Sequence, residues 1–174
     1  MEPAQRGEWI RSLFEQYQGA LVRYAARLTG NIDAARDAVQ ETFMQLCQMD
    51  PTELDERPVP WLYTVCRNRA LDGRRKEARM NALGEECEDV AELRTPNPLQ
   101  MAERRSSTSV VLRALKSLPA NQQEVIRLKF QDGMSYKEIS QVTGLSVSNV
   151  GFLIHVGVKG IRVAVNGGSG HENR

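Results

Sequence analysis

The chain has 174 residues, a formal net charge of +1 and 41% hydrophobic residues, which is typical of a soluble protein with one domain or two small ones. It has no apolar run long enough to cross a bilayer and no signal-peptide core at its start, so we expect a cytoplasmic protein without membrane insertion. Its three cysteines and two histidines have no metal-binding spacing, so we predict neither a metal nor another cofactor. Cys47 and Cys66 are expected to be reduced thiols that face a core.

The first 80 residues predict three helices. Apolar side chains recur at steps of three and four over residues 9–28, the period of a helix with one buried face, and a glycine ends the pattern. Asn31 or Asp33 can cap a second helix that runs to about Met49. The apolar face of this second helix consists of Ala35, Val39, Phe43, Leu46 and Cys47.

Prolines and acids interrupt the helical pattern at residues 50–60, where DPTELDERPVP disfavours both helix and strand. Pro60 suits the first position of a third helix that ends near Met80. The residues of this helix expected to point inward are Trp61, Leu62, Val65 and Cys66. Its basic residues are Arg67, Arg69, Arg74, Arg75, Lys76 and Arg79. We therefore expect a first domain at residues 1–80 that ends in a cationic helix.

Residues 81–105 predict a flexible acidic linker. Acids predominate there, and the run TPNP breaks any helix. Such a sequence buries too little apolar surface to offset the entropy of ordering. A second helical domain is expected at residues 106–166, with one helix up to about Leu118 and another that carries Val125, Ile126, Leu128 and Phe130. Residues 167–174 predict a disordered tail.

Residues 135–162 predict a helix-turn-helix. Ser135 and Glu138 form a capping box at the start of the first helix. Gly144 can take the left-handed conformation that ends this helix, and Ser146 offers an N-cap oxygen to the next one. The buried stripe expected on the second helix is Val147, Val150, Ile154, Val158, Ile161 and Val165. Its outer face is expected to present Ser148, Asn149, Phe152, Val156 and Lys159 toward a DNA major groove.

No strand alternation occurs in the sequence, so the predicted fold class is all-α, with a three-helix unit and a four-helix unit joined by the linker. This order of parts resembles the bacterial RNA polymerase sigma factors of the extracytoplasmic-function (ECF) group of the sigma-70 family. DAARDAVQETFMQL resembles region 2.2, PWLYTVCRNRALDGRRK resembles regions 2.3 and 2.4, and LPANQQEVIRLKFQDGMSYKEISQVTGLS resembles region 4. The resemblance covers residues 9–165.

The resemblance implies that the chain is not an enzyme but a subunit that binds core RNA polymerase and directs promoter-specific initiation. The implied partners are the β′ coiled coil and the β flap of the polymerase, promoter DNA, and an anti-sigma factor as regulator. Region 2.2 of the family docks on the coiled coil through a polar helix face. The residues on this face are Asp37, Gln40 and Glu41, with Phe43 nearby.

Region 2 of the family melts the minus-ten promoter element and captures a base from the opened strand, which requires cations for phosphates and aromatic faces for bases. The candidates for this contact are Trp61, Tyr63, Arg67, Asn68, Arg74 and Arg75. For Trp61, core packing is favoured over base stacking. Residues 52–59 lie where the family has its base-specificity loop, so we expect them to form the rim of the base pocket.

Region 4 of the family binds the minus-thirty-five element. The candidates are Lys137, Ser146, Ser148, Asn149, Phe152, His155, Lys159 and Arg162. The reading helix departs from the family, which commonly carries lysine or arginine near the positions of Gly151, Leu153 and Val156. Phe152 and Val156 are apolar residues on a face expected to be solvated. They either touch thymine methyl groups or are covered by a regulator such as an anti-sigma factor, and the sequence leaves both interpretations open.

Two further alternatives stay open in the sequence. The acids of the linker either imitate nucleic acid in a basic channel of the polymerase or only keep the linker soluble. A free-standing helix-turn-helix regulator would account for residues 135–162 but leaves residues 33–80 without a role. An enzyme is disfavoured, because the sequence contains no phosphate loop, no metal cluster and no nucleophile beside a base.

Overall fold

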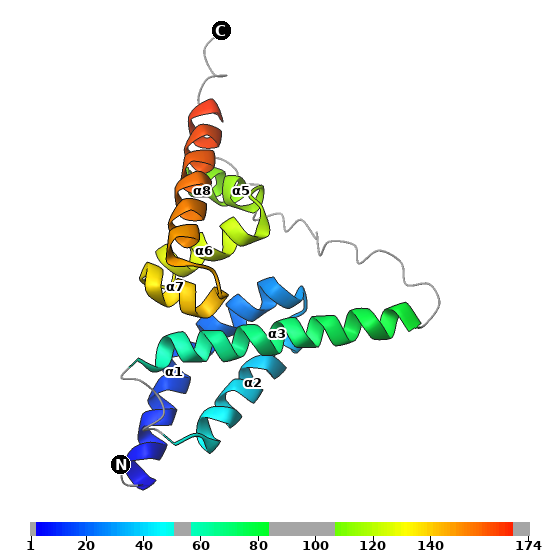
Figure 1. The fold of residues 1–174 in the computed structure, drawn as a ribbon, viewed down its shortest axis with the longest axis vertical. Coiled ribbons are helices and arrows are strands. Elements are labelled where there is room, and N and C mark those ends of the chain that lie inside the picture. The colour runs from blue at the N-terminus through cyan, green and yellow to red at the C-terminus, as the bar shows by residue number, and fades with distance from the viewer. Residues whose placement is uncertain (1–2, 51–56, 84–106, 169–174) are drawn as a thin grey trace. The chain divides into compact units, whose positions relative to one another are not determined.

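The computed structural model describes residues 3–50, 57–83 and 107–168 (Figure 1). Its helices are α1 (Pro3–Thr29), α2 (Ile32–Gln48), α3 (Pro58–Leu83), α5 (Ser107–Lys116), α6 (Ala120–Phe130), α7 (Tyr136–Thr143) and α8 (Val147–Gly168). Every regular element in these ranges is a helix, which confirms the all-α prediction. Most of the expected linker, loop residues 51–56 and residues 169–174 lie outside the described ranges. Residues 81–83 and 167–168, predicted as linker and tail, belong to α3 and α8.

The chain divides into two compact units, one with α1, α2 and α3 and the other with α5, α6, α8 and most of α7. In the first unit each helix packs against the other two. The shared core includes Leu21, Leu46, Leu62 and Cys66, which are all at most 1% exposed. The rings of Tyr24 and Tyr63 lie beside one another with their centroids 5.2 Å apart, which joins α1 to α3.

Polar contacts at the helix ends turn α1 and α2 into an antiparallel hairpin. Gly30 adopts φ +72° after the end of α1. The side chain of Asn31 accepts hydrogen bonds from the amides of Asp33 and Ala34, so Asn31, and not Asp33, is the N-cap of α2. At the opposite end, the guanidinium of Arg6 donates to the carbonyl oxygens of Cys47 (2.9 Å) and Met49. These bonds give the polar first turns of α1 a tertiary partner. The helix therefore begins at Pro3 instead of near residue 9.

The two cysteines of the first unit differ in environment. Cys66 is buried as predicted, and burial raises the pKa of its thiol to about 12, although a hydrogen bond with Thr42 acts in the opposite direction. Cys47 was expected to face the core, and this prediction is wrong, because its side chain is exposed. Leu46 occupies the core position at this turn of α2 and is 1% exposed. Cys47 therefore lies at the edge of the apolar stripe.

The second unit is built around α8, which packs against α5 and α6. Its core includes Leu128, Ile139, Val150 and Ile154. Gly157 is also buried in α8, and a Cβ atom at this position would lie 2.5 Å from Cδ1 of Ile126. The lack of a side chain at this residue lets α8 approach α6 closely.

The buried stripe of α8 is rotated from the one expected. Val147 was predicted to be buried but is 47% exposed, because it is the first residue of the helix and lies at the edge of the packed face. Leu153 is instead 7% exposed and belongs to the core. Phe130, expected among the apolar residues of its helix, is 64% exposed at the last position of α6. Packing against α5 and α6 decides these positions, not helical period alone.

Two glycines inside helices provide a test of this packing. We expect Gly73→Ala to raise the free energy of unfolding of the first unit by about 0.5–1 kcal/mol, because alanine favours a helix and no atom beyond the adjoining residues and the backbone of α3 lies within 4 Å of the new Cβ. Gly157→Ala should lower the free energy of unfolding of the second unit by about 1 kcal/mol. The new methyl group crowds Ile126 at a cost of about 1–3 kcal/mol, which outweighs the gain in helix propensity. Urea unfolding followed by circular dichroism measures both. Equal stabilisation by the two substitutions would contradict the close approach of α8 and α6.

Candidate polymerase and nucleic-acid interfaces

The solvent-facing side of α2 carries four exposed residues at helical spacing, namely Asp37, Gln40, Glu41 and Met44, which we call the α2 ridge. Three of them are the polar residues predicted for polymerase docking. The carboxylate of Glu41 lies 3.5 Å from Nε of Arg69 on α3, and both side chains are about half exposed. Met44 was missed by sequence analysis and is 54% exposed. Its position four residues after Gln40 was the available signal, because i and i+4 residues share one helix face.

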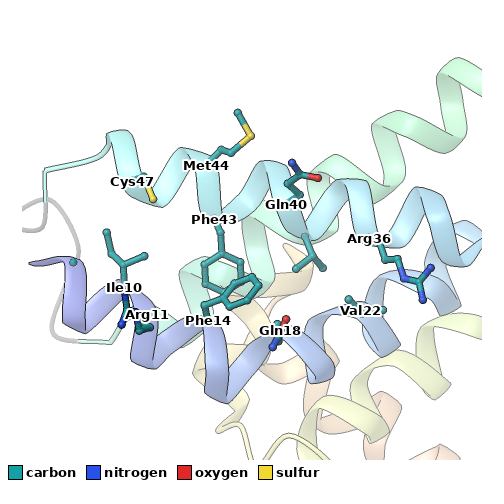
Figure 2. Close-up of a pocket in the computed structure, with 12 residues that line it drawn as sticks. Ile10, Arg11, Phe14, Gln18, Val22, Arg36, Gln40, Phe43, Met44 and Cys47 are labelled. Atoms are coloured by element: carbon teal, nitrogen blue, oxygen red, sulfur yellow. The ribbon is translucent and has the colours of Figure 1, made fainter.

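An apolar groove of about 790 Å³ runs between α1 and α2 beside the ridge (Figure 2). Its apolar lining includes Ile10, Phe14, Val39, Phe43 and Met44. Its polar lining consists of Arg11, Gln18, Arg36 and Gln40, with no carboxylate.

Phe43 was predicted on the docking surface but is only 6% exposed, so it belongs mainly to the core. Its ring meets the ring of Phe14 edge to face, with centroids 5.0 Å apart. Phe43 therefore supports the groove from within, and Met44 is the exposed apolar residue of the ridge.

The second half of α3 is a solvated cationic surface. Every residue from 72 to 80 is exposed, and this stretch contains Arg74, Arg75, Lys76 and Arg79. Arg75 lies 3.4 Å from the carboxylate of Asp72. Nη1 of Arg74 donates to the carbonyl oxygen of Leu28 at 3.2 Å, where a cation is favourable because the C-terminus of α1 carries partial negative charge. Arg74 thus stabilises the first unit and contributes positive charge to its surface.

In the first half of α3, one residue predicted to contact the minus-ten element is buried. Tyr63 was expected to offer an aromatic face to a base, but its side chain is 1% exposed and packs against Tyr24. Helical geometry places Tyr63 on the same side as Leu62 and Cys66, which are buried between α1 and α2. Trp61 and Arg67 are half-buried, and Asn68 is exposed. Of the two predicted aromatic residues, Trp61 alone keeps a solvent-accessible surface in the described structure.

The helix-turn-helix is held by the caps that the sequence predicted. The amide of Ser135 donates to the Glu138 carboxylate at 2.7 Å, and the amide of Glu138 donates to Oγ of Ser135 at 3.2 Å. Gly144 has φ +74° and ends α7. Oγ of Ser146 accepts from the amide of Asn149 at 3.2 Å and caps α8.

The angle between α7 and α8 follows from these caps. In the described part of the chain, no single helix is long and apolar enough to cross a membrane; α7 and α8 pass that test only as a pair bent by 104°. The bend makes a helix-turn-helix of the short α7 and the long α8, and α8 presents one long face.

The outer face of α8 is basic and polar, and it also carries the exposed apolar side chains of Phe152 and Val163. The exposed candidates are Ser148, Asn149, Phe152, His155, Lys159 and Arg162. Phe152 is 63% exposed. Val156 was expected on the same face but is half-buried. The sequence of α8 contains no aspartate or glutamate, so no carboxylate on this helix opposes the field of Lys159 and Arg162.

Sequence analysis missed an aromatic contact at the start of α7. Tyr136 is 40% exposed, and Nζ of Lys129 lies 5.4 Å from the centroid of its ring, within the range of a cation–π contact. The same ring lies against Gly151, where a Cβ would be 3.5 Å from its edge. The signal in the sequence was an aromatic residue directly after the N-cap serine. Lys137 and Ser146, both predicted contacts, are exposed near this end of the helix-turn-helix.

A basic helical unit and a helix-turn-helix unit in one short chain define a two-domain helical protein of the DNA-binding class. Residues 13–80 match Sigma-70 region 2, and residues 109–159 match Sigma-70, region 4. The ECF RNA polymerase sigma factor SigL of Mycobacterium tuberculosis is 31% identical over 160 residues, which cover 90% of this chain and 88% of the relative. The chain belongs to the ECF group of RNA polymerase sigma factors.

Other relatives are more distant. The ECF RNA polymerase sigma factor SigM of Bacillus subtilis is 26% identical over 141 residues, which cover 80% of this chain and 85% of the relative. A solved structure of the sigma factor RpoE from Bartonella quintana, determined in complex with the anti-sigma factor NepR, is similar in fold. Its TM-score is 0.63 at 23% identity, with coverage of 90% of this chain and 96% of that chain.

The different burial of Tyr63 and Trp61 predicts different effects on stability. Tyr63→Ala should lower the free energy of unfolding of the first unit by about 3–5 kcal/mol, as removal of a buried aromatic ring usually does. Trp61→Ala should have a clearly smaller effect, because Trp61 is partly in solvent. Both tryptophans of the chain, Trp9 and Trp61, lie in α1 and α3, so tryptophan fluorescence during urea unfolding reports this unit. Equal losses in the two variants would show that the assigned burial is wrong.

Proposed function

We propose that this sigma factor binds core RNA polymerase through the α2 ridge, opens the minus-ten element with the basic end of α3 and reads the minus-thirty-five element with the outer face of α8. The observation that carries the proposal is that the α2 ridge and the outer face of α8 lie on the solvent side of helices whose opposite side is buried, while residues 72–80 at the basic end of α3 are all exposed. The chain acts in the cytoplasm as a binding subunit without catalytic activity of its own. Its partners are core polymerase, promoter DNA and an anti-sigma protein.

The α2 ridge has the composition of a protein contact. Met44 supplies exposed apolar area at the C-terminal end of the ridge, where it also lines the apolar groove, and Asp37, Gln40 and Glu41 supply polar groups before it. Interfaces combine apolar surface with polar groups, and methionine is enriched in them. The β′ coiled coil of the polymerase is the partner that we assign to this ridge. The second unit would contact the β flap, which the exposed Val111 (40%) and Leu112 (42%) on α5 support.

The basic end of α3 suits the opened minus-ten element. Its exposed arginines are positioned for phosphates, and Trp61 lies at the start of the same helix with part of its ring accessible. Single-stranded DNA is held by this combination of cations for the backbone and aromatic surface for a base. Because Tyr63 is in the core, base stacking in the proposal relies on Trp61 alone among the predicted aromatic residues.

The outer face of α8 suits the major groove of the upstream element. In a helix-turn-helix, the N-terminal part of the second helix contacts base edges. Ser148 and Asn149 lie in the first turn of α8, and Lys159 and Arg162 follow on the same side. With few cations on this helix, binding by the free protein should be weak, and specific initiation should require the polymerase.

Control by an anti-sigma protein belongs to the same proposal. The structural relative from Bartonella quintana was solved with such a partner. A protein that covered the α2 ridge would compete directly with the polymerase. The alternative of a free-standing helix-turn-helix regulator leaves this ridge and the basic end of α3 without a role.

The α2 ridge can be tested by single substitutions. Met44→Ala and Asp37→Lys should each weaken binding to core polymerase by about tenfold or more, because the few residues that dominate an interface each contribute about 1–2 kcal/mol or more. The fold should be unchanged, since both side chains are exposed. Competition with labelled wild-type protein for core polymerase measures the effect, and circular dichroism monitors the helices.

Glu15→Lys on α1 is the matched control, because it makes the same kind of charge change at an exposed site of the first unit outside the groove. It should bind core polymerase like the wild type. If the ridge variants remain helical and compete as well as Glu15→Lys, the docking assignment is wrong.

The proposed contacts of α3 with the minus-ten element and of α8 with the upstream element can be tested separately by comparing duplex and premelted promoters. Replacing Arg74 and Arg75 by alanine should impair opening of duplex promoters, since phosphate contacts beside the melted element are lost. Replacing Asn149 and Lys159 should lower recognition of the upstream element, with less effect on a premelted template. Each phosphate contact removed should also flatten the salt dependence of binding by about one unit of slope. Permanganate footprints on duplex and premelted promoters measure opening directly.

Arg74 also bonds the carbonyl of Leu28, so its loss can perturb the fold. The pair Arg75→Ala and Lys76→Ala leaves that bond intact and provides the control. It should reproduce the opening defect with an unchanged unfolding midpoint. Identical behaviour of the α3 and α8 variants on both templates would rule out this division of labour.

A further inference from the structure

We propose that Phe152 is a specificity-determining residue that reads the 5-methyl group of one thymine in the upstream promoter element. This inference rests on the proposed reading of that element by α8. Beyond that proposal, it names the base that is recognised, thymine, and the group on that base, the 5-methyl group.

Phe152 is placed to project from the reading helix. It is the sixth residue of α8 and 63% exposed, whereas Val150, Leu153 and Ile154 on the opposite side are at most 7% exposed. Its neighbours one turn before and directly before it are the short Ser148 and Gly151, and the ring stays mostly exposed although the Tyr136 side chain lies against Gly151. The ring therefore extends from the first two turns of α8, the part that reaches base edges in a helix-turn-helix.

The surroundings of Phe152 favour DNA over a protein partner. A protein interface has a contiguous apolar centre depleted of charge. Here Ser148 and His155 lie one turn away on the same face, Lys159 lies two turns away, and Val156 is half-buried. The other large exposed apolar residues of α8 are Val147 (47%), five residues earlier and about 140° away around the helix, and Val163 (65%), eleven residues further on, or about 16 Å along the axis.

The charge of α8 also favours DNA over a protein as the partner of Phe152. The sequence of α8 has Lys159 and Arg162 and no acidic residue. A cationic frame complements the phosphates that flank a major groove. Phe152 is thus one apolar probe within a surface suited to a polyanion.

The chemistry of the side chain selects the base. A phenyl ring has no hydrogen-bond donor or acceptor, so it cannot read the polar edges of guanine, cytosine or adenine. Thymine alone among the four bases presents a methyl group in the major groove. Burial of one such group contributes about a fourfold change in affinity, because about 0.8 kcal/mol is gained per carbon removed from water.

The test uses holoenzyme assembled from this chain and core polymerase. A promoter is first selected from duplexes with a randomised upstream element, and each thymine of that element is then replaced singly by deoxyuridine, which lacks only the methyl group. For wild-type holoenzyme, one replacement should weaken binding by about fourfold and the others by less than about twofold. In Phe152→Ala holoenzyme that difference should disappear, and thymine and uracil promoters should bind alike.

Three variants serve as controls. Phe152→Leu keeps an apolar contact and should retain part of the preference for thymine. Lys159→Ala should weaken binding to both promoters by a similar factor, because it removes charge and not methyl contact. Val163→Ala removes an equally exposed apolar residue further along α8 and should leave the preference unchanged.

Persistence of the thymine preference in Phe152→Ala, or the absence of any sensitive thymine in a selected element, would overturn this inference and leave the reading of the element by α8 intact. Failure of the holoenzyme to select any upstream sequence would overturn both the inference and that part of the proposed function. If Phe152→Ala impaired capture of a purified regulator and had no effect on promoters, the residue would belong to a protein contact and the inference would be wrong.

Discussion

The described structure depends on the burial of one apolar stripe per helix in two small cores. Leu21, Leu46 and Leu62 meet in the first unit, and Leu128, Ile139 and Val150 meet in the second, all of them at most 1% exposed. Removal of such surfaces from water is the main favourable term in folding. Because each helix needs only one face for this purpose, its other face is left for partners. The ridge of α2 and the outer face of α8 arise in this way, whereas residues 72–80 at the basic end of α3 are exposed on every side.

Burial of apolar faces does not by itself determine the angles between the helices or the residues at which the helices end. Polar side chains fix these features. Arg6 bonds the carbonyls that end α2, Arg74 bonds a carbonyl that ends α1, and Arg69 lies against Glu41 between α2 and α3. Unpaired carbonyls at helix ends attract such cations. Arg74 and Glu41 therefore belong both to the framework of the first unit and to the surfaces proposed for DNA and polymerase. The same side chains that face partners thus also make contacts between helices.

In the second unit, glycines determine how the reading helix is presented. Gly144 ends α7 in a left-handed conformation, and the following helix leaves at a bend of 104°. Gly157 lets α8 approach Ile126 of α6 at a distance that no Cβ would permit. Docked in this way, α8 buries Val150 and Leu153 and directs Phe152 and Lys159 to solvent. A cationic face with a single exposed ring is the result, and it is a better match for DNA than for an apolar protein surface.

The sequence alone determined the all-α class, the Ser135 cap, the Gly144 turn and the polar residues of α2, and it narrowed the cap of α2 to Asn31 or Asp33, because caps, turns and helical period are local properties that a few neighbouring residues decide. Tertiary packing decided the rest. Periodicity did not reveal that Tyr63 packs against Tyr24. It also did not reveal that Cys47 is exposed while Leu46 is buried, or that Leu153 is buried and Val147 exposed on α8. Each of these residues lies at the edge of an apolar stripe, where the position of a second helix determines whether a side chain is covered. The same physical reason explains Met44 and Phe43, adjacent residues on α2 of which one is exposed and the other lies against Phe14.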